Sequence, residues 1–347
     1  MANYFFKTLT SADRTQSRTL LHENIPITGT LLSGTYNTDS SGREVNVKVF
    51  SHGMFQSVYD YPYASSSANH ILDISAGFST NASSVSSSAT TAASMAPKKV
   101  NIYNQMAQVL VGYDTGSNVR IFDADGNFAA GGTQHHDVVF INFSRLLVKD
   151  EIKKGSFSII IGDEAAYATP FESEFTVSDA GADTSYHSNS PAGEYGILKS
   201  GSANIGLIYY QAGIAVLTGS VFGLATNMTA DGTKIEGLLT GSSLNATADA
   251  VRHRIKNISF NNSTELNSTI FFCRANHNEF NYSSNPTYLS SSKIVVKDNE
   301  PLNLPRSYVT TVGLYSPDNE LMAVAKVSEP LRKDPTNELT LRVRLDY

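Results

Sequence analysis

The last strand-like run of this chain alternates apolar and polar side chains with a period of two. Its apolar positions are Leu339, Leu341, Val343 and Leu345, and its polar positions are Thr340, Arg342 and Arg344. Successive side chains of a β-strand point to opposite faces, so this spacing predicts a strand with one apolar and one basic face. A chain that repeats such runs is expected to fold mainly into sheets.

A β-hairpin is predicted just before this run. The segments Tyr308–Tyr315 and Leu321–Val327 are strand-like, and Ser316–Glu320 joins them. The joining segment contains a proline, which fixes its own φ, followed by Asp and Asn, which tolerate turn conformations. A further strand is expected at Thr269–Cys273, so the whole C-terminal region is predicted to be β-rich.

An aromatic and amide-rich segment, Phe280–Tyr288, lies between these strands. It contains a proline and fits neither a helix nor a sheet ladder. Because such a segment buries little of itself, we expect it to be ordered by packing on another surface, such as a neighbouring chain. The candidate interface residues are Phe280, Tyr282, Pro286, Tyr288, Arg342, Arg344 and Tyr347. A sheet that only caps its own core is the competing interpretation.

The rest of the chain predicts short strands and two helices. Helices are expected at Pro97–Gly112, where apolar residues recur every three or four positions, and at Leu244–Lys256. The cations at the end of the second helix, Arg252, His253 and Arg254, are explained by the helix dipole alone. Expected strands are Ile25–Leu32, Val45–Phe50, Val119–Phe122, Val138–Phe143, Phe157–Ile161, Gly206–Tyr210 and Ile214–Leu217.

Together these elements predict a β-rich α+β fold of mostly antiparallel sheets with a few short helices and long loops. The Ser-rich segment Ser79–Met95 is predicted to be a linker. We therefore expect an N-terminal β-rich region of residues 1–96, a central α+β domain of residues 97–257 and a C-terminal attachment module of residues 258–347. The apolar N-terminal residues Tyr4, Phe5 and Phe6 are expected to dock on the main body or on another chain.

Composition narrows the range of partners. Charged residues make up 17% of the chain, below the usual ~25%, which favours a surface covered by other chains. The net charge of −6 offers no cationic surplus for phosphates, so nucleic acid is not an expected partner. Cys273 is the single cysteine, so an internal disulfide cannot form. No apolar run approaches the ~18 residues of a membrane helix, and the N-terminus lacks the pattern of a signal peptide.

No motif predicts catalysis, a metal or a cofactor. Asp123 and Asp125 faintly resemble a calcium loop, but the other ligands at EF-hand spacing are missing. Adjacent histidines on a strand, as at His135 and His136, point to opposite faces and do not suit one metal. We expect no enzyme, although a pair of carboxylates for glycan cleavage stays open. The absence of Trp argues against a glycan-binding module.

Several long stretches resemble virion structural proteins of contractile-tailed bacteriophages, notably marine ones. They are KKVNIYNQMAQVLVGYD (98–114), INFSRLLVKDEIKKGSFS (141–158), EYGILKSGSANIGLIYYQAGIAVLTGSVFG (194–223), FNYSSNPTYL (280–289), TTVGLYSPDNELMAVAKVSEPLRK (310–333) and LTLRVRLDY (339–347). The resemblance spans most of the chain. It implies a non-enzymatic tail protein, assembled in the host cytoplasm with other virion proteins and present in several copies.

The position that this resemblance implies within the particle is a wedge-type subunit of the tail baseplate. A neck, collar or head-surface protein is the alternative, and a glycan-binding or glycan-cleaving tail protein is a weaker one. For the baseplate subunit the expected mechanism is packing, in which the Tyr282–Tyr288 segment and the basic strand around Arg342 and Arg344 contact neighbouring subunits.

Overall fold

A computed structural model describes residues 6–34, 36–38, 42–80, 96–128, 132–223, 226–241, 243–283, 286, 289–290, 293–294 and 304–347. Strands make up 45% of the chain and helices 15%, which confirms the predicted β-rich α+β class. The segment expected to be a linker falls almost entirely outside the described residues.

The helices are short except for two. They are α1 (Gly29–Leu32), α2 (Ala96–Leu110), α3 (Arg145–Val148), α4 (Ile235–Thr240) and α5 (Leu244–Arg254), with 3-10 turns η1 (Ser11–Asp13) and η3 (Gly219–Val221). The strands are β1 (Arg14–Thr28), β2 (Val47–Val49), β3 (Gln56–Tyr59), β4 (His70–Phe78), β5 (Phe122–Asp123), β6 (Gln134–His135), β7 (Asp137–Phe143), β8 (Glu151–Ile152), β9 (Ser158–Gly162), β10 (Glu174–Ser178), β11 (His187–Ser190), β12 (Gly193–Ser200), β13 (Ala203–Tyr209), β14 (Ile214–Thr218), β15 (Ile255–Ala275), β16 (Leu289–Ser290), β17 (Lys293–Ile294), β18 (Ser307–Tyr315), β19 (Leu321–Lys333) and β20 (Leu339–Asp346).

The chain forms two compact units. The large unit is Leu21–Thr264, and the small unit combines Met1–Leu20 with Glu265–Tyr347. Strands β1 and β15 contribute residues to both units. This division differs from the three expected regions, because β4 pairs with β7 across the expected boundary at residue 96 and so joins the first two regions in one sheet.

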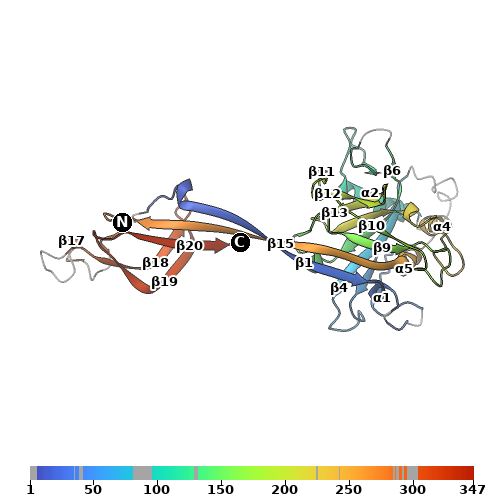
Figure 1. The fold of residues 1–347 in the computed structure, drawn as a ribbon, viewed down its shortest axis with the longest axis horizontal. Helices are drawn as coiled ribbons and strands as arrows, with labels where there is room; N and C mark the ends of the chain where they lie inside the picture. Colours follow the sequence, from blue (N-terminus) through green and yellow to red (C-terminus); the bar gives the residue numbers. More distant parts are fainter. Residues whose placement is uncertain are drawn as a thin grey trace. The chain divides into compact units, whose positions relative to one another are not determined.

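The large unit is built on an antiparallel sheet in the order β15-β9-β10-β12-β13-β14-β7-β4-β3-β2 (Figure 1). Its central strand β7 is apolar on both faces. Val138 and Phe140 enter one apolar cluster, while Val139, Ile141 and Phe143 enter another. A strand buried on both sides reads as a continuous apolar run, as the sequence of β7 does.

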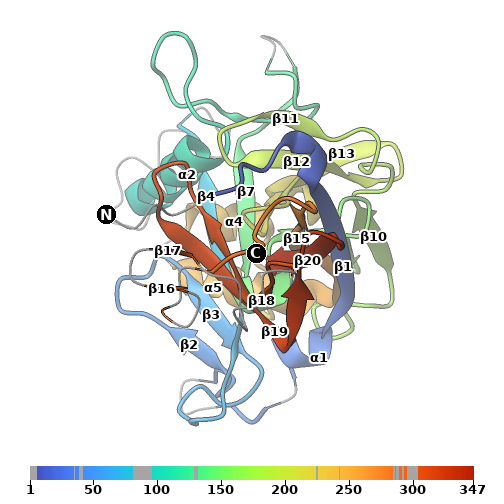
Figure 2. The ribbon, with the colours of Figure 1, turned by 90° about the vertical axis from the view of Figure 1, so that its left-hand side faces the viewer.

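Helices cover both faces of this sheet. Tyr103, Ala107 and Leu110 of α2 belong to the first cluster, and Figure 2 shows α2 beside β4. On the other face, α4 and α5 contribute Leu238 and Val251 to the second cluster. The close fit of α2 depends on Gly77 in β4, because a Cβ there would lie 2.7 Å from the carbonyl oxygen of Lys99.

The small unit consists mainly of two antiparallel strand pairs. The end of β15 pairs with β20, with Phe271 opposite Val343. Separately, β18 pairs with β19 in the predicted hairpin. The register of this hairpin breaks between Val309 and Thr311, opposite a segment of β19 that contains Pro330, which has no N–H to donate to a ladder.

Most predicted elements are present, and a few boundaries are wrong. Helices α2 and α5 and strands β7, β9, β13, β14 and β20 lie close to their expected positions. The expected strand Ile25–Leu32 ends at Thr28, and the next four residues form the single turn α1. Gly29 makes this turn possible, since a Cβ there would lie 2.4 Å from the carbonyl oxygen of Ile255.

Candidate functional site

The predicted interface residues lie on the small unit but do not form one patch. Phe280 and Tyr282 line a groove of about 370 Å³. Arg342 and Arg344 are exposed on the opposite side of β20 from Leu341, which lines the same groove. Tyr347 and Pro286 are exposed, and Tyr288 lies outside the described residues.

The groove is formed by three strands that are distant in sequence. Cys273 of β15, Val309 and Val312 of β18, and Leu339 and Leu341 of β20 all line it. All five side chains are only half-buried. The sequence predicted the apolar face of β20, but it gave no sign that β18 turns its own apolar face toward the same space.

The N-terminal residues reach this groove as well. Lys7 and Leu9 line it, and the Lys7 ammonium lies 2.6 Å from a carboxylate oxygen of Glu279. The Phe6 ring packs edge-on against Tyr315 with centroids 4.9 Å apart. Of the three N-terminal aromatic residues expected to dock, Phe6 is described, and it docks on the hairpin of its own unit.

Polar contacts hold the Phe280–Tyr282 segment. The buried Lys333 ammonium donates to Asn281 Oδ1 at 2.7 Å and to the carbonyl oxygen of Asp334 at 3.0 Å. Asn281 also donates to the carbonyl of His277 at 2.8 Å, and the Ser307 hydroxyl donates to the carbonyl of Phe280. These bonds hold the Phe280 carbonyl and the Asn281 side chain, while the side chains of Phe280 and Tyr282 remain exposed.

The basic face of β20 is partly neutralised. Arg344 donates from Nε to Asp346 at 2.7 Å and from Nη2 to the Ser268 hydroxyl at 3.1 Å. The hydrogen bond from Ser268, followed by the bonds and charge of Arg344, lowers the pKa of Asp346. Arg342 stands opposite Phe272 on the neighbouring strand.

Apolar exposure is concentrated in the small unit. Val343, at 7% exposure, is the one buried apolar side chain among the described residues of that unit, and neither apolar cluster includes a residue from it. Twelve of the twenty large apolar side chains that are exposed in the described chain belong to it, although it is much the shorter unit. Four of them gather at the turn end of the hairpin: Tyr315, Leu321, Met322 and Val324.

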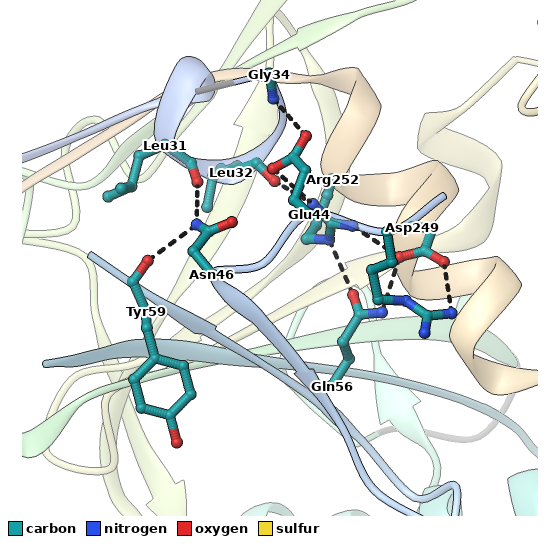
Figure 3. Close-up of polar contacts among 10 residues, drawn as sticks. Leu31, Leu32, Gly34, Glu44, Asn46, Gln56, Tyr59, Asp249 and Arg252 are labelled. Atoms are coloured by element: carbon teal, nitrogen blue, oxygen red, sulfur yellow. Dashed lines mark hydrogen bonds and ion pairs between the residues drawn. The ribbon is translucent and has the colours of Figure 1, made fainter. Parts of the chain in front are cut away.

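The large unit instead holds its charges in buried networks (Figure 3). Arg252 in α5 donates from Nε to Gln56 at 2.9 Å, from Nη2 to Asp249 at 2.7 Å, and from Nη1 to the carbonyl of Leu32. Its guanidinium also lies 3.8 Å from the Glu44 carboxylate, whose pKa is raised by burial. This network ties α5 to α1, β3 and the segment before β2.

Two further buried cations bind backbone carbonyls. Arg254 donates to the carbonyls of Glu164 at 2.7 Å, Ala166 at 3.3 Å and Asn227. Lys99 donates to the carbonyls of Leu238 at 2.6 Å, Leu239 at 2.7 Å and Gly241 at 3.2 Å, at the end of α4. The explanation of Arg252 and Arg254 by the dipole of α5 alone is therefore wrong, because both side chains are buried and bind groups from distant segments.

The residues considered as possible metal ligands lie in different environments. Within the described residues, no group of three or more His, Cys, Asp or Glu side chains could hold a metal ion. His136 Nδ1 and the Ser79 hydroxyl share a hydrogen bond of 2.8 Å, whose direction depends on the histidine tautomer. Burial lowers the pKa of His135 to about 4. Asp123 is buried, and its carboxylate accepts a hydrogen bond of 2.7 Å from the backbone N–H of Phe128, whereas Asp125 is exposed.

No protein-family model, no curated protein and no solved structure matches this chain. Among the described residues, none of the helices has the length and apolar character needed to cross a bilayer.

Proposed function

We propose that this chain is a non-enzymatic structural subunit of a bacteriophage virion, located at the tail baseplate. Its small unit joins it to neighbouring subunits by packing. The phage assignment is supported by the resemblance of six long sequence stretches, and the packing role is supported by the chemistry of the small unit.

One observation carries the packing role: the described residues of the small unit form a groove and a ridge of apolar side chains but bury only one apolar side chain, Val343. A folded domain normally buries many apolar side chains, and each one contributes roughly 1.5–3 kcal/mol. Exposed apolar patches rimmed by polar groups are typical of protein–protein contact sites. The large unit has two apolar clusters and so does not need a partner in the same way.

Assembly of particles with a truncated chain tests this proposal. Deleting Asp334–Tyr347 removes β20 and with it Val343, the one buried apolar side chain among the described residues of the small unit. Particles made without the wild-type chain should then lack the protein, while the large unit stays folded. Normal, infectious particles containing the truncated chain would contradict the proposal.

A point substitution gives a milder test with a matched control. Tyr282→Ala in the small unit should lower incorporation, whereas Tyr113→Ala in the large unit should not, although the two tyrosines are 51% and 52% exposed. Imaging of a label fused to the chain in intact virions locates it. A label at the neck or on the head would contradict the baseplate position.

A further inference from the structure

We propose that the groove of the small unit is filled by the hairpin ridge of a second copy of this chain. The groove is the space lined by Cys273, Val309, Val312, Leu339 and Leu341. The ridge consists of Tyr315, Leu321, Met322 and Val324. This inference rests on the packing role proposed above and adds the identity of the partner.

The need for a partner follows from what the small unit lacks. It holds one buried apolar side chain among its described residues, and the single cysteine of the chain rules out an internal disulfide. Small folded units with little core depend on disulfides, metals or association with other chains. Of these, association fits the apolar groove, and a copy of the same chain is present whenever the chain is made.

The small unit carries both halves of a contact. Its groove is concave and mostly apolar, and its ridge is exposed and apolar, with Met322 69% and Val324 52% exposed. A molecule with a ridge and a groove can bind another copy reciprocally, so that each copy gives its ridge and receives the ridge of the other. Two complementary surfaces in one unit favour a second copy over an unrelated protein.

The distribution of charge also favours copies that meet through the small unit. Residues 1–20 and 265–347 contain twelve Lys or Arg and eleven Asp or Glu, a net charge of +1, which leaves −7 for residues 21–264. Two large units, each with a net charge of −7, repel each other at neutral pH much more strongly than two small units, each with +1. The hairpin also carries both signs, with Lys326 and Glu329 in β19, so charges of one copy can face opposite charges of the other.

The first test is the molecular mass of the full chain in solution. Sedimentation equilibrium at 1–50 µM, a range chosen around typical self-association constants, should show a dimer or a larger homo-oligomer. The double variant Met322→Glu and Val324→Glu should raise the dissociation constant by at least about 100-fold, since two buried apolar side chains per ridge are lost. The control Val109→Glu and Leu146→Glu changes two residues that are 63% and 77% exposed in the large unit and should leave the mass unchanged.

The single cysteine provides a second readout at the groove itself. Cys273 is half-buried and lines the groove, so a copy seated there should shield it. Its rate of alkylation by N-ethylmaleimide should fall as the concentration of wild-type protein rises. The double ridge variant should react at the faster rate at every concentration, while circular dichroism shows that it remains folded.

Several results overturn the inference. One is a monomeric wild-type chain at 50 µM; another is an oligomer whose mass and thiol protection survive the ridge substitutions. If the wild-type chain is monomeric but the ridge variant is still excluded from particles, the partner is a different protein and the packing role stands. If the chain self-associates as expected but the ridge variant enters particles normally, the proposed function fails instead.

Discussion

Replacing Arg252 with Met should destabilise the large unit by about 4 kcal/mol at pH 7. Methionine keeps the apolar stem of the side chain but removes all of the donors. The substitution leaves Gln56 Oε1 and the Leu32 carbonyl without the donor that they have in the folded protein. It also leaves Glu44 without the guanidinium 3.8 Å away.

The magnitude follows from these three losses. A buried acceptor that loses its donor costs roughly 1–3 kcal/mol, and removing one member of a buried ion pair costs roughly 3–5 kcal/mol in total. Asp249 limits the damage, because Gln56 Nε2 still donates to it at 2.8 Å and Arg43 still lies 3.5 Å away. The value of about 4 kcal/mol lies inside this range.

The loss should also depend on pH through Glu44. Burial raises the pKa of Glu44 and Arg252 opposes this shift, so the pKa rises further in the variant. A carboxyl group whose pKa is raised by folding carries no charge penalty below its unfolded pKa of about 4.5, and the penalty appears as pH rises through the folded pKa. The variant should therefore lose less stability at pH 4 than at pH 7.

Urea unfolding followed by circular dichroism measures both quantities. Arg342→Met is the control, because that arginine is exposed on β20 and its loss should change stability by no more than about 0.5 kcal/mol. Adding Glu44→Gln to the variant should restore about 1–2 kcal/mol, since a neutral side chain no longer needs the cation. Strictly additive effects of the two substitutions would refute the reasoning.

Two further substitutions test how α2 is held. Lys99→Met should cost about 1–3 kcal/mol at pH 7, because the carbonyls at the end of α4 lose their donor. Burial lowers the pKa of Lys99 to about 8, whereas the unfolded chain still binds this proton up to a pH of about 10.5. The free energy of unfolding of the wild-type protein should therefore increase relative to that of the variant as the pH rises from about 8 to 10.5. Urea titrations of both proteins at pH 7 and pH 10 check this, and an equal difference at the two pH values would contradict it. Gly77→Ala should cost about 2–4 kcal/mol, because the new Cβ would lie 2.7 Å and 2.9 Å from backbone atoms of α2. Gly223→Ala is the control, because its Cβ would meet no atom closer than 3.6 Å. Thermal unfolding of both variants measures the loss of stability, and equal losses would show that α2 moves to accommodate the new Cβ at no cost.

Local patterns in the sequence were enough to predict some elements of the fold, although strands such as β4 (His70–Phe78) were missed and the expected strand Val119–Phe122 is present only as β5 (Phe122–Asp123). The alternation at Leu339–Leu345, the turn residues at Ser316–Glu320 and the helical spacing after Pro97 each act within a few residues, and each element formed. Predicted strand boundaries were wrong where a contact with a distant part of the backbone sets the end of the strand. Gly29 is an example, because it lies against the carbonyl of Ile255.

The polar networks and the groove could not be predicted in this way. Arg252 binds the carbonyl of Leu32, which is 220 positions away in the sequence, and Lys99 binds that of Leu238, which is 139 positions away. The residues adjacent to Arg252 and Lys99 in the sequence therefore give no indication that these cations are buried. The groove requires Cys273, Val309 and Leu339 to converge from three strands. The predicted interface residues Phe280 and Tyr282 line it, and Asn281 between them is bound by the buried Lys333, which no local pattern singles out.

The manner in which Arg254 is bound has a consequence for how this protein can vary between relatives. The acceptors are main-chain oxygens, at Glu164, Ala166 and Asn227, so the amino acids at those positions can be exchanged without loss of the contact. An insertion or deletion that displaces those oxygens should be strongly destabilising, because the buried guanidinium would then lose its hydrogen-bond acceptors. Across homologues, the segments around Glu164–Ala166 and around Asn227 should therefore vary in amino-acid type but keep a fixed length, and Arg254 should be conserved.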